Sequence, residues 1–186
     1  MLDGIRKPEL SQVELERIRA GLPPKGEIKP SSKEARKLSS IRPILEYHRR
    51  DRSIEVKLVS AVQAGLGLHA RSLILISAAA LRQLDEEELQ ALAAHELGHD
   101  YFWDRYQRAL DAQDAQTTQE LELRCDAIAI FTLADLGLNP RKLLSGLARL
   151  NDFNARFGAP ANEGLYIPHS ERVRFMEALI ALIHTR

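Results

Sequence analysis

The chain has 186 residues, of which 45% are apolar and 5% aromatic, which is typical of one helix-rich globular domain. Its 26 basic residues balance 26 acidic ones, so it lacks the positive excess with which proteins hold a nucleic-acid backbone. The single cysteine excludes an intrachain disulfide, and the longest apolar stretch, 73–81, is far shorter than the ~20 residues that cross a bilayer. No export signal follows Met1, so we expect a soluble protein, cytoplasmic by default, or periplasmic or secreted if a leader was trimmed.

Residues 1–52 differ from the rest of the chain in charge. They carry 13 basic against 8 acidic residues, whereas the remainder carries 13 against 18. Short helices are predicted here, separated by the Pro- and Gly-containing segment 23–32 and interrupted again at Pro43. The sequence therefore predicts a basic helical arm, residues 1–52, ahead of a mildly acidic body, residues 53–186.

Two strands are predicted at the start of the body. Apolar and polar residues alternate through 54–62 with the two-residue period of a half-buried strand. Gly65 and Gly67 predict a turn, and the apolar run 73–77 predicts a second, more buried strand.

Helices are predicted to fill the remainder of the body. Asp85 and Glu88 form the capping box of one helix, and Thr117 and Glu120 predict the start of another, after a polar break. The second of these helices is apolar on most faces and should be the central buried helix, ending at Gly137. Two further helices are predicted, one opened by Asn139 and Pro140 and one at about 171–185.

The first of these helices carries an H-E-x-x-H motif, formed by His95, Glu96 and His99. Residues four apart on a helix differ by only about 40° in direction, so both imidazoles can bind one metal ion. Glu96 lies on the flank of that face, where it can act as a general base on an attacking water. The motif is short enough to arise by chance, and the competing interpretation is two histidines that are merely hydrogen-bonded within a helix. The capped helix with its apolar background favours the metal site.

A catalytic zinc needs a third protein ligand and one open position. Glu122, at the start of the next helix, is the nearest candidate, and Asp126 follows four residues later on the same face. A carboxylate at Asp126 can accept the distal N–H of a metal-bound imidazole and so orient the ring. Glu120 is the rival ligand, but its expected place in a capping box gives it another function. We therefore predict that Glu122 binds the metal and that Asp126 orients a ligand.

The motif and its surroundings resemble the M48 zinc metallopeptidases, the HtpX/Ste24/Oma1-like gluzincins. The resemblance depends on HELGH preceded by LDEEELQALAA and followed by ELRCDAIAIFTLADLGLNP, and it covers about residues 54–186. In that family the Glu of a later E-x-x-x-D is the third zinc ligand, and Glu122 and Asp126 match that pattern. The resemblance implies one Zn²⁺ per chain, a peptide or unfolded-protein substrate, and an α+β zincin-like fold. That fold is mainly helical, with a small mixed β-sheet whose edge strand borders the active-site cleft.

Two further segments are assigned by the same resemblance. Residues 62–65, Val62-Gln63-Ala64-Gly65, replace an N-A-F-like segment of the family and are expected to be the substrate-binding edge strand. The family also tends to carry His-Pro near a downstream Arg, whereas this chain has Pro-His, with His169, and then Arg172. His169 is expected to be catalytic, either as a donor to the oxyanion or on the open zinc position that keeps the enzyme latent. The competing interpretation is that His169 belongs only to the N-terminus of a helix. Arg172 is expected to serve the oxyanion or to fix the loop, and Tyr166 is a further candidate donor.

Other residues give weaker signals. The aromatic residues that follow the motif could shape a specificity pocket, but packing against the N-terminal helices is favoured; they are Tyr101, Phe102, Trp103 and Tyr106. Cys125 has apolar neighbours and is predicted to be an inert core thiol. The remaining unpaired histidines are predicted to lie at the surface, namely His48, His69 and His184.

The leading hypothesis is a zinc-dependent endopeptidase in which Glu96 activates water. One rival is a binding module that keeps the metal for structure only, and another is a metal-dependent hydrolase of non-peptide substrates. The charge of residues 1–52 suggests either a pro-segment that covers the cleft or a tether for a partner. The oligomeric state is not predicted.

Overall fold

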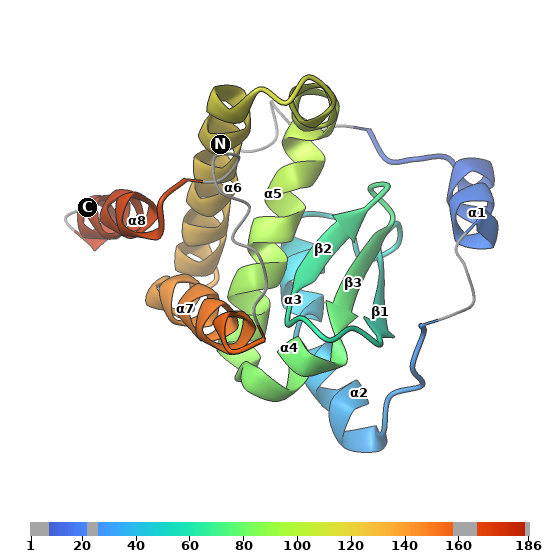
Figure 1. The fold of residues 1–186 in the computed structure, drawn as a ribbon. Coiled ribbons are helices and arrows are strands. Elements are labelled where there is room, and N and C mark those ends of the chain that lie inside the picture. The colour runs from blue at the N-terminus through green and yellow to red at the C-terminus, as the bar shows by residue number, and fades with distance from the viewer. Residues whose placement is uncertain (1–7, 22–25, 158–166, 185–186) are drawn as a thin grey trace.

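The structure, a computed structural model, describes residues 8–21, 26–157 and 167–184, which form eight helices and three strands in an α+β arrangement (Figure 1). The elements in chain order are α1 (Gln12–Gly21), α2 (Ser32–Ser39), α3 (Arg42–Tyr47), β1 (Glu55–Val59), β2 (Leu66–His69), β3 (Leu73–Ser77), α4 (Ala78–Gln83), α5 (Glu86–Asp111), α6 (Ala115–Asp135), α7 (Arg141–Ala155) and α8 (His169–His184). None of these described helices is long and apolar enough to span a membrane.

The sheet is small and mixed, with strand order β1-β3-β2. β1 runs parallel to the buried central strand β3, and β2 runs antiparallel to β3 as an edge strand. The strand predicted at 54–62 is shorter than expected, because β1 covers only Glu55–Val59. The predicted turn at Gly67 is wrong, because Gly67 lies inside β2 and pairs with Leu75 of β3. The turn lies instead at Ala70 and Arg71, whose φ angles are 46° and 56°. The Leu-Gly-Leu-His sequence of β2 has little strand character of its own, so pairing with β3 decides its conformation.

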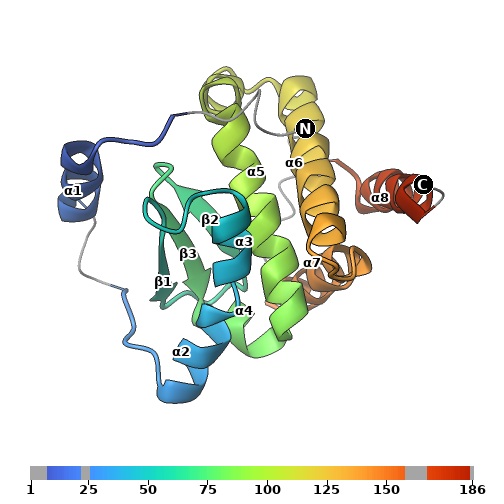
Figure 2. The same cartoon turned by 180° about the vertical axis from the view of Figure 1, so that it is seen from behind.

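Helix α5 lies between the sheet and α6, and both views show α5 and α6 side by side (Figures 1 and 2). Gly98 allows this close packing: a Cβ built on Gly98 would lie 2.7 Å from the Cα of Cys125 on α6. Cys125 is fully buried, as expected of a core thiol, and burial raises the pKa of its thiol well above the usual value. The motif helix and the predicted central helix therefore meet backbone to backbone at the middle of the H-E-x-x-H motif.

The predicted helix starts are confirmed in part. Asp85 and Glu88 form the expected capping box at the start of α5. The N-cap of helix α6 lies three residues earlier than predicted, at Asp114, whose side chain accepts from the N–H of Thr117. The predicted capping box of Thr117 and Glu120 is therefore wrong. Helix α8 likewise begins at His169 rather than at 171.

The hydrophobic core runs across the predicted division between residues 52 and 53. Ile41 and Ile44, beside and within α3, are fully buried in the same cluster as the apolar residues of β3 and α5. His48, predicted to lie at the surface, is buried: its Nδ1 lies 2.8 Å from the hydroxyl of Tyr101 and its Nε2 lies 3.0 Å from that of Thr132. The segment around α3 thus packs against residues 53–186 through both apolar and polar contacts.

Candidate metal centre

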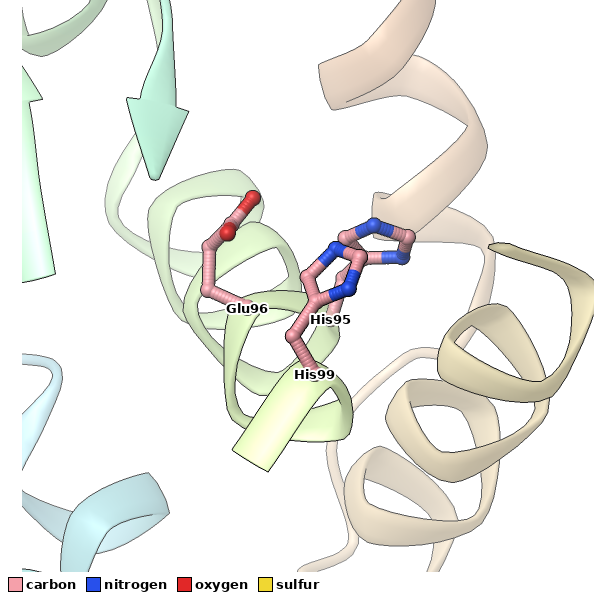
Figure 3. Close-up of side chains that lie close together, drawn as sticks. All are labelled: His95, Glu96 and His99. Atoms are coloured by element: carbon pink, nitrogen blue, oxygen red, sulfur yellow. The ribbon is translucent and has the colours of Figure 1, made fainter. Parts of the chain in front are cut away.

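The three residues of the H-E-x-x-H motif lie near the middle of α5. His95, Glu96 and His99 each present one metal-ligating atom, and these atoms lie within 4.8 Å of one another. The two imidazole rings lie together on one side of the helix, with centroids 5.0 Å apart, while Glu96 points to the flank (Figure 3). All three side chains belong to one turn of a capped helix, so the local geometry follows directly from the i, i+4 spacing.

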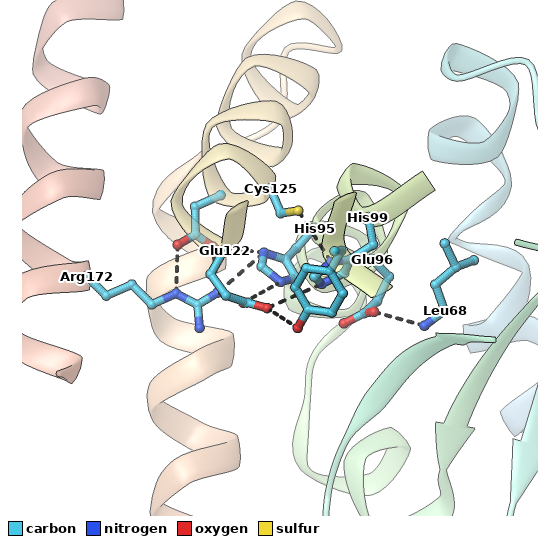
Figure 4. A network of polar contacts seen from close by, with 9 residues as sticks. Leu68, His95, Glu96, His99, Glu122, Cys125 and Arg172 are labelled. Atoms are coloured by element: carbon cyan, nitrogen blue, oxygen red, sulfur yellow. Dashed lines mark hydrogen bonds and ion pairs between the residues drawn. The ribbon is translucent and has the colours of Figure 1, made fainter. Parts of the chain in front are cut away.

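Helix α6 brings Glu122 to both imidazoles. Its Oε2 lies 3.4 Å from Nε2 of His95, and its Oε1 lies 3.7 Å from Nε2 of His99 (Figure 4). Two donors bound tetrahedrally to one zinc at 2.0–2.1 Å lie about 3.4 Å apart. Each separation is close to that value, although the two imidazoles face different oxygens of the carboxylate. Two histidines and one glutamate are also a donor set of catalytic zinc sites. The rival ligand Glu120 is exposed and pairs with Arg105 at 3.4 Å.

Asp126 lies on the far side of His95 from Glu122. Its Oδ1 is 2.8 Å from Nδ1 of His95, which leaves Nε2 of that ring directed toward Glu122. Arg172 of α8 donates to both oxygens of Asp126 at 2.7 Å, and its Nη2 lies 3.6 Å from Oε2 of Glu122. Arg172 therefore ties α8 to the carboxylate that orients His95.

The charges of these buried groups are strongly coupled. Burial disfavours the charged form of His95, but its hydrogen bonds with Asp126 and Glu122 outweigh burial and raise its pKa to about 10. Burial and the charge of His95 lower the pKa of His99 to about 4. Burial would raise the pKa of Glu122, yet contact with His95 holds it well below its usual value. The positive charge of His95 and the negative charges of Asp126 and Glu122 therefore stabilise one another.

Glu96 lies on the sheet side of the site. Its Oε2 accepts the backbone N–H of Leu68 in β2 at 2.9 Å. The side chain is partly shielded from solvent, and this desolvation is the main reason why its pKa is raised to about 7. Glu96 is thus held beside the histidines by the edge strand.

A cavity of about 460 Å³ opens onto these residues. It is bounded by β2 and the segment before it, by the motif face of α5, and by α6, α7 and α8. His95, Glu96, His99, Glu122 and Arg172 all line it. Of the described residues in 1–52, none lines this cavity, which gives no support to a pro-segment that covers the site.

The predicted substrate strand at 62–65 is misplaced by a few residues. Residues 62–65 form the segment before the edge strand, and the strand itself is β2, from Leu66 to His69. Ala64 and Gly65 line the cavity, whereas Val62 is 75% exposed. Asn154 of α7 holds Ala64 through bonds to its N–H and its C=O, at 2.7 and 2.8 Å. Gly65 is held in turn by Ser77 at the end of β3, whose N–H donates to the C=O of Gly65 at 3.0 Å. The segment is therefore not a strand, but it is fixed both to α7 and to the end of the sheet.

The structure does not bring every predicted site residue to the cavity. His169 is the first residue of α8, is exposed, and does not line the cavity, so its position gives no support to a catalytic role. Tyr166 lies outside the described residues.

The aromatic residues after the motif divide between two environments. Tyr101 packs against His48, and the ring of Phe102 lies 5.8 Å from the guanidinium carbon of Arg124. Trp103 and Tyr106 instead line the cavity, and the hydroxyl of Tyr106 donates to Oε1 of Glu122 at 2.7 Å. The predicted packing against the N-terminal helices therefore holds for Tyr101, whose partner His48 caps α3, whereas the contact of Phe102 is with α6 and the other two rings face the cavity. Helical spacing from His99 was the available signal, because residue 106 lies two turns further along the same face.

Comparison of the sequence with protein-family models and with curated proteins gives no match. The assignment of a function therefore depends on the residues of this site and on the elements that hold them.

Proposed function

We propose that this chain is a zinc-dependent endopeptidase of the M48-like type, with the metal bound by His95, His99 and Glu122 and with Glu96 as general base. The observation that carries the proposal is the approach of Glu122 to both imidazoles, at 3.4 and 3.7 Å, from a different helix. The sequence spacing alone accounts for two of the ligands, but the third meets them only because α5 and α6 pack closely.

The chain's own residues have distinct parts in this reaction. A zinc ion supplies a Lewis acid that polarises a carbonyl group and makes water more acidic. Glu96 would be close enough to the histidines to take a proton from the attacking water and to return it to the leaving amine. Asp126 keeps Nδ1 of His95 occupied, so that Nε2 is the nitrogen left for the metal.

The position of the edge strand β2 favours a peptide as the substrate over other hydrolysable compounds. The N–H of Leu68 points away from β3, toward Glu96. In an antiparallel strand the backbone groups of alternate residues point the same way, so those of Leu66 also face outward. Both residues line the cavity. The N–H of Leu68 is held by Glu96, so an extended peptide could pair with this edge through the main chain of Leu66 and the C=O of Leu68.

A binding module with a purely structural metal is the main alternative. Such a site normally closes its fourth position with protein and has no use for a nearby free base. Here Glu96 lies beside the two histidines and shares their cavity. These features favour catalysis over a structural role.

The Glu96→Gln variant separates the two functions. The endopeptidase proposal predicts that this variant binds one zinc per chain, as the wild type does, and loses hydrolysis of a peptide library by a factor of at least about 100. Mass spectrometry of the digests and metal analysis give the two readouts. Equal cleavage by the variant and the wild type, or no zinc-dependent cleavage by the wild type, would contradict the proposal.

A further inference from the structure

Tyr106 lies on the metal-facing side of α5 although it is outside the H-E-x-x-H motif. It follows His99 by seven residues, and seven residues on an α-helix return to within about 20° of the starting direction. Its ring packs against the imidazole of His99, with centroids 4.4 Å apart and an interplanar angle of 64°. The helix thus adds a third side chain to the face that carries the two histidines.

The hydroxyl of Tyr106 is directed to one specific acceptor. It donates to Oε1 of Glu122 at 2.7 Å, while Oε2 of the same carboxylate faces His95 at 3.4 Å and Arg172 at 3.6 Å. Glu122 is 5% exposed, so solvent supplies little alternative hydrogen bonding. A carboxylate has about four acceptor positions, and it can therefore accept the tyrosine hydroxyl and still bind a metal.

Packing alone does not require this hydroxyl. A phenylalanine at the same position would keep the ring contact with His99 but would leave Oε1 of Glu122 without this donor. The carboxylate could then rotate about its terminal torsion, which is broad for Glu. The hydroxyl is thus the group that distinguishes a positioning role from a packing role.

We propose that Tyr106 is a positioning residue for the metal centre, which fixes the carboxylate of Glu122 in the orientation that faces both histidines. This inference rests on the proposed role of Glu122 as a zinc ligand. Through it, Tyr106 sets the affinity of the site for zinc.

The test is zinc affinity, measured on the full chain by competition with a chromophoric chelator. Tyr106→Phe removes only the hydroxyl, and loss of a group that orients a metal ligand typically weakens binding by about 10–100-fold. Tyr47→Phe is the matched control, because its hydroxyl also donates to a carboxylate, that of Asp135, on the surface. We expect weaker zinc binding in the first variant, wild-type affinity in the second, and similar melting temperatures for both zinc-free variants.

The possible outcomes separate this inference from the proposed function. Equal zinc affinity in Tyr106→Phe and the wild type overturns the inference and leaves the endopeptidase proposal standing. A zinc-free Tyr106→Phe protein that melts far below Tyr47→Phe also overturns it, because the hydroxyl then supports the fold. A wild-type chain that binds no stoichiometric zinc contradicts the proposed function itself.

Discussion

Gly98, inside the H-E-x-x-H motif, is expected to control how closely the two ligand-bearing helices approach. In Gly98→Ala the new Cβ would lie 2.7 Å from Cα and 2.8 Å from Cβ of Cys125. These are not flexible atoms, so α6 must move away, and it carries Glu122 with it. Replacing a helical glycine by alanine favours the helix by about 1 kcal/mol, whereas overpacking of a core costs about 1–3 kcal/mol. We therefore expect a net loss of up to about 2 kcal/mol, together with weaker zinc binding.

Gly146→Ala is the matched control for this substitution. Its new Cβ would also meet a neighbour, but the nearest atom, at 3.2 Å, is Cδ1 at the flexible end of the Leu92 side chain. The helix-propensity gain should then roughly cancel the steric cost, and zinc affinity should be unchanged. Urea unfolding of the zinc-free proteins and chelator competition measure the two effects. If Gly98→Ala were as stable as Gly146→Ala and bound zinc as the wild type does, the packing argument would be refuted.

Two further substitutions separate the metal centre from its support. Asp126→Asn weakens the hydrogen-bond acceptor for His95 and should lower zinc affinity about 10-fold or more. The control Glu120→Gln, on the same helix, should leave zinc affinity unchanged. Equal zinc affinity in Asp126→Asn and the wild type would contradict the orienting role of Asp126. Asp100→Ala removes the buried carboxylate that pairs with Arg50 and Arg71, and it should lower the free energy of unfolding in urea by about 3–5 kcal/mol in the zinc-free protein. The control Glu46→Ala removes an exposed ion pair and should cost about 0.5 kcal/mol. A loss below about 1 kcal/mol for Asp100→Ala would contradict a stabilising role of the buried pair.

Features set by local sequence could be predicted, and those set by tertiary contacts could not. The capping box of Asp85 and the four-residue spacing of His95 and His99 fix helix start and ligand direction within one element. The strand Leu66–His69 was missed because two leucines, a glycine and a histidine have little strand propensity until β3 pairs with them. Helix α6 begins after Asp114 because the side chain of Asp114, rather than that of Thr117, accepts from an N–H of the first turn, that of Thr117.

The candidate site shows the same division. Glu122 and Asp126 could be chosen from the sequence because they lie four residues apart on one helix face. The capping argument used against Glu120 was wrong. Glu120 differs from Glu122 instead in its exposure, because Glu120 is exposed and Glu122 is buried. The hydrogen bond from Tyr106 to Glu122 joins two helices at positions that no local pattern links. His48 has no spacing signal either, because its partners lie on α5 and α6, far along the chain.

Zinc content of the wild type against Glu122→Ala is the most direct test of the metal centre. The expected result is one zinc per wild-type chain, retained through dialysis, and loss of most of that zinc in Glu122→Ala, because only His95 and His99 would remain as ligands. A Glu122→Ala protein that keeps stoichiometric zinc with unchanged affinity would contradict the three-ligand site and the reaction proposed for it.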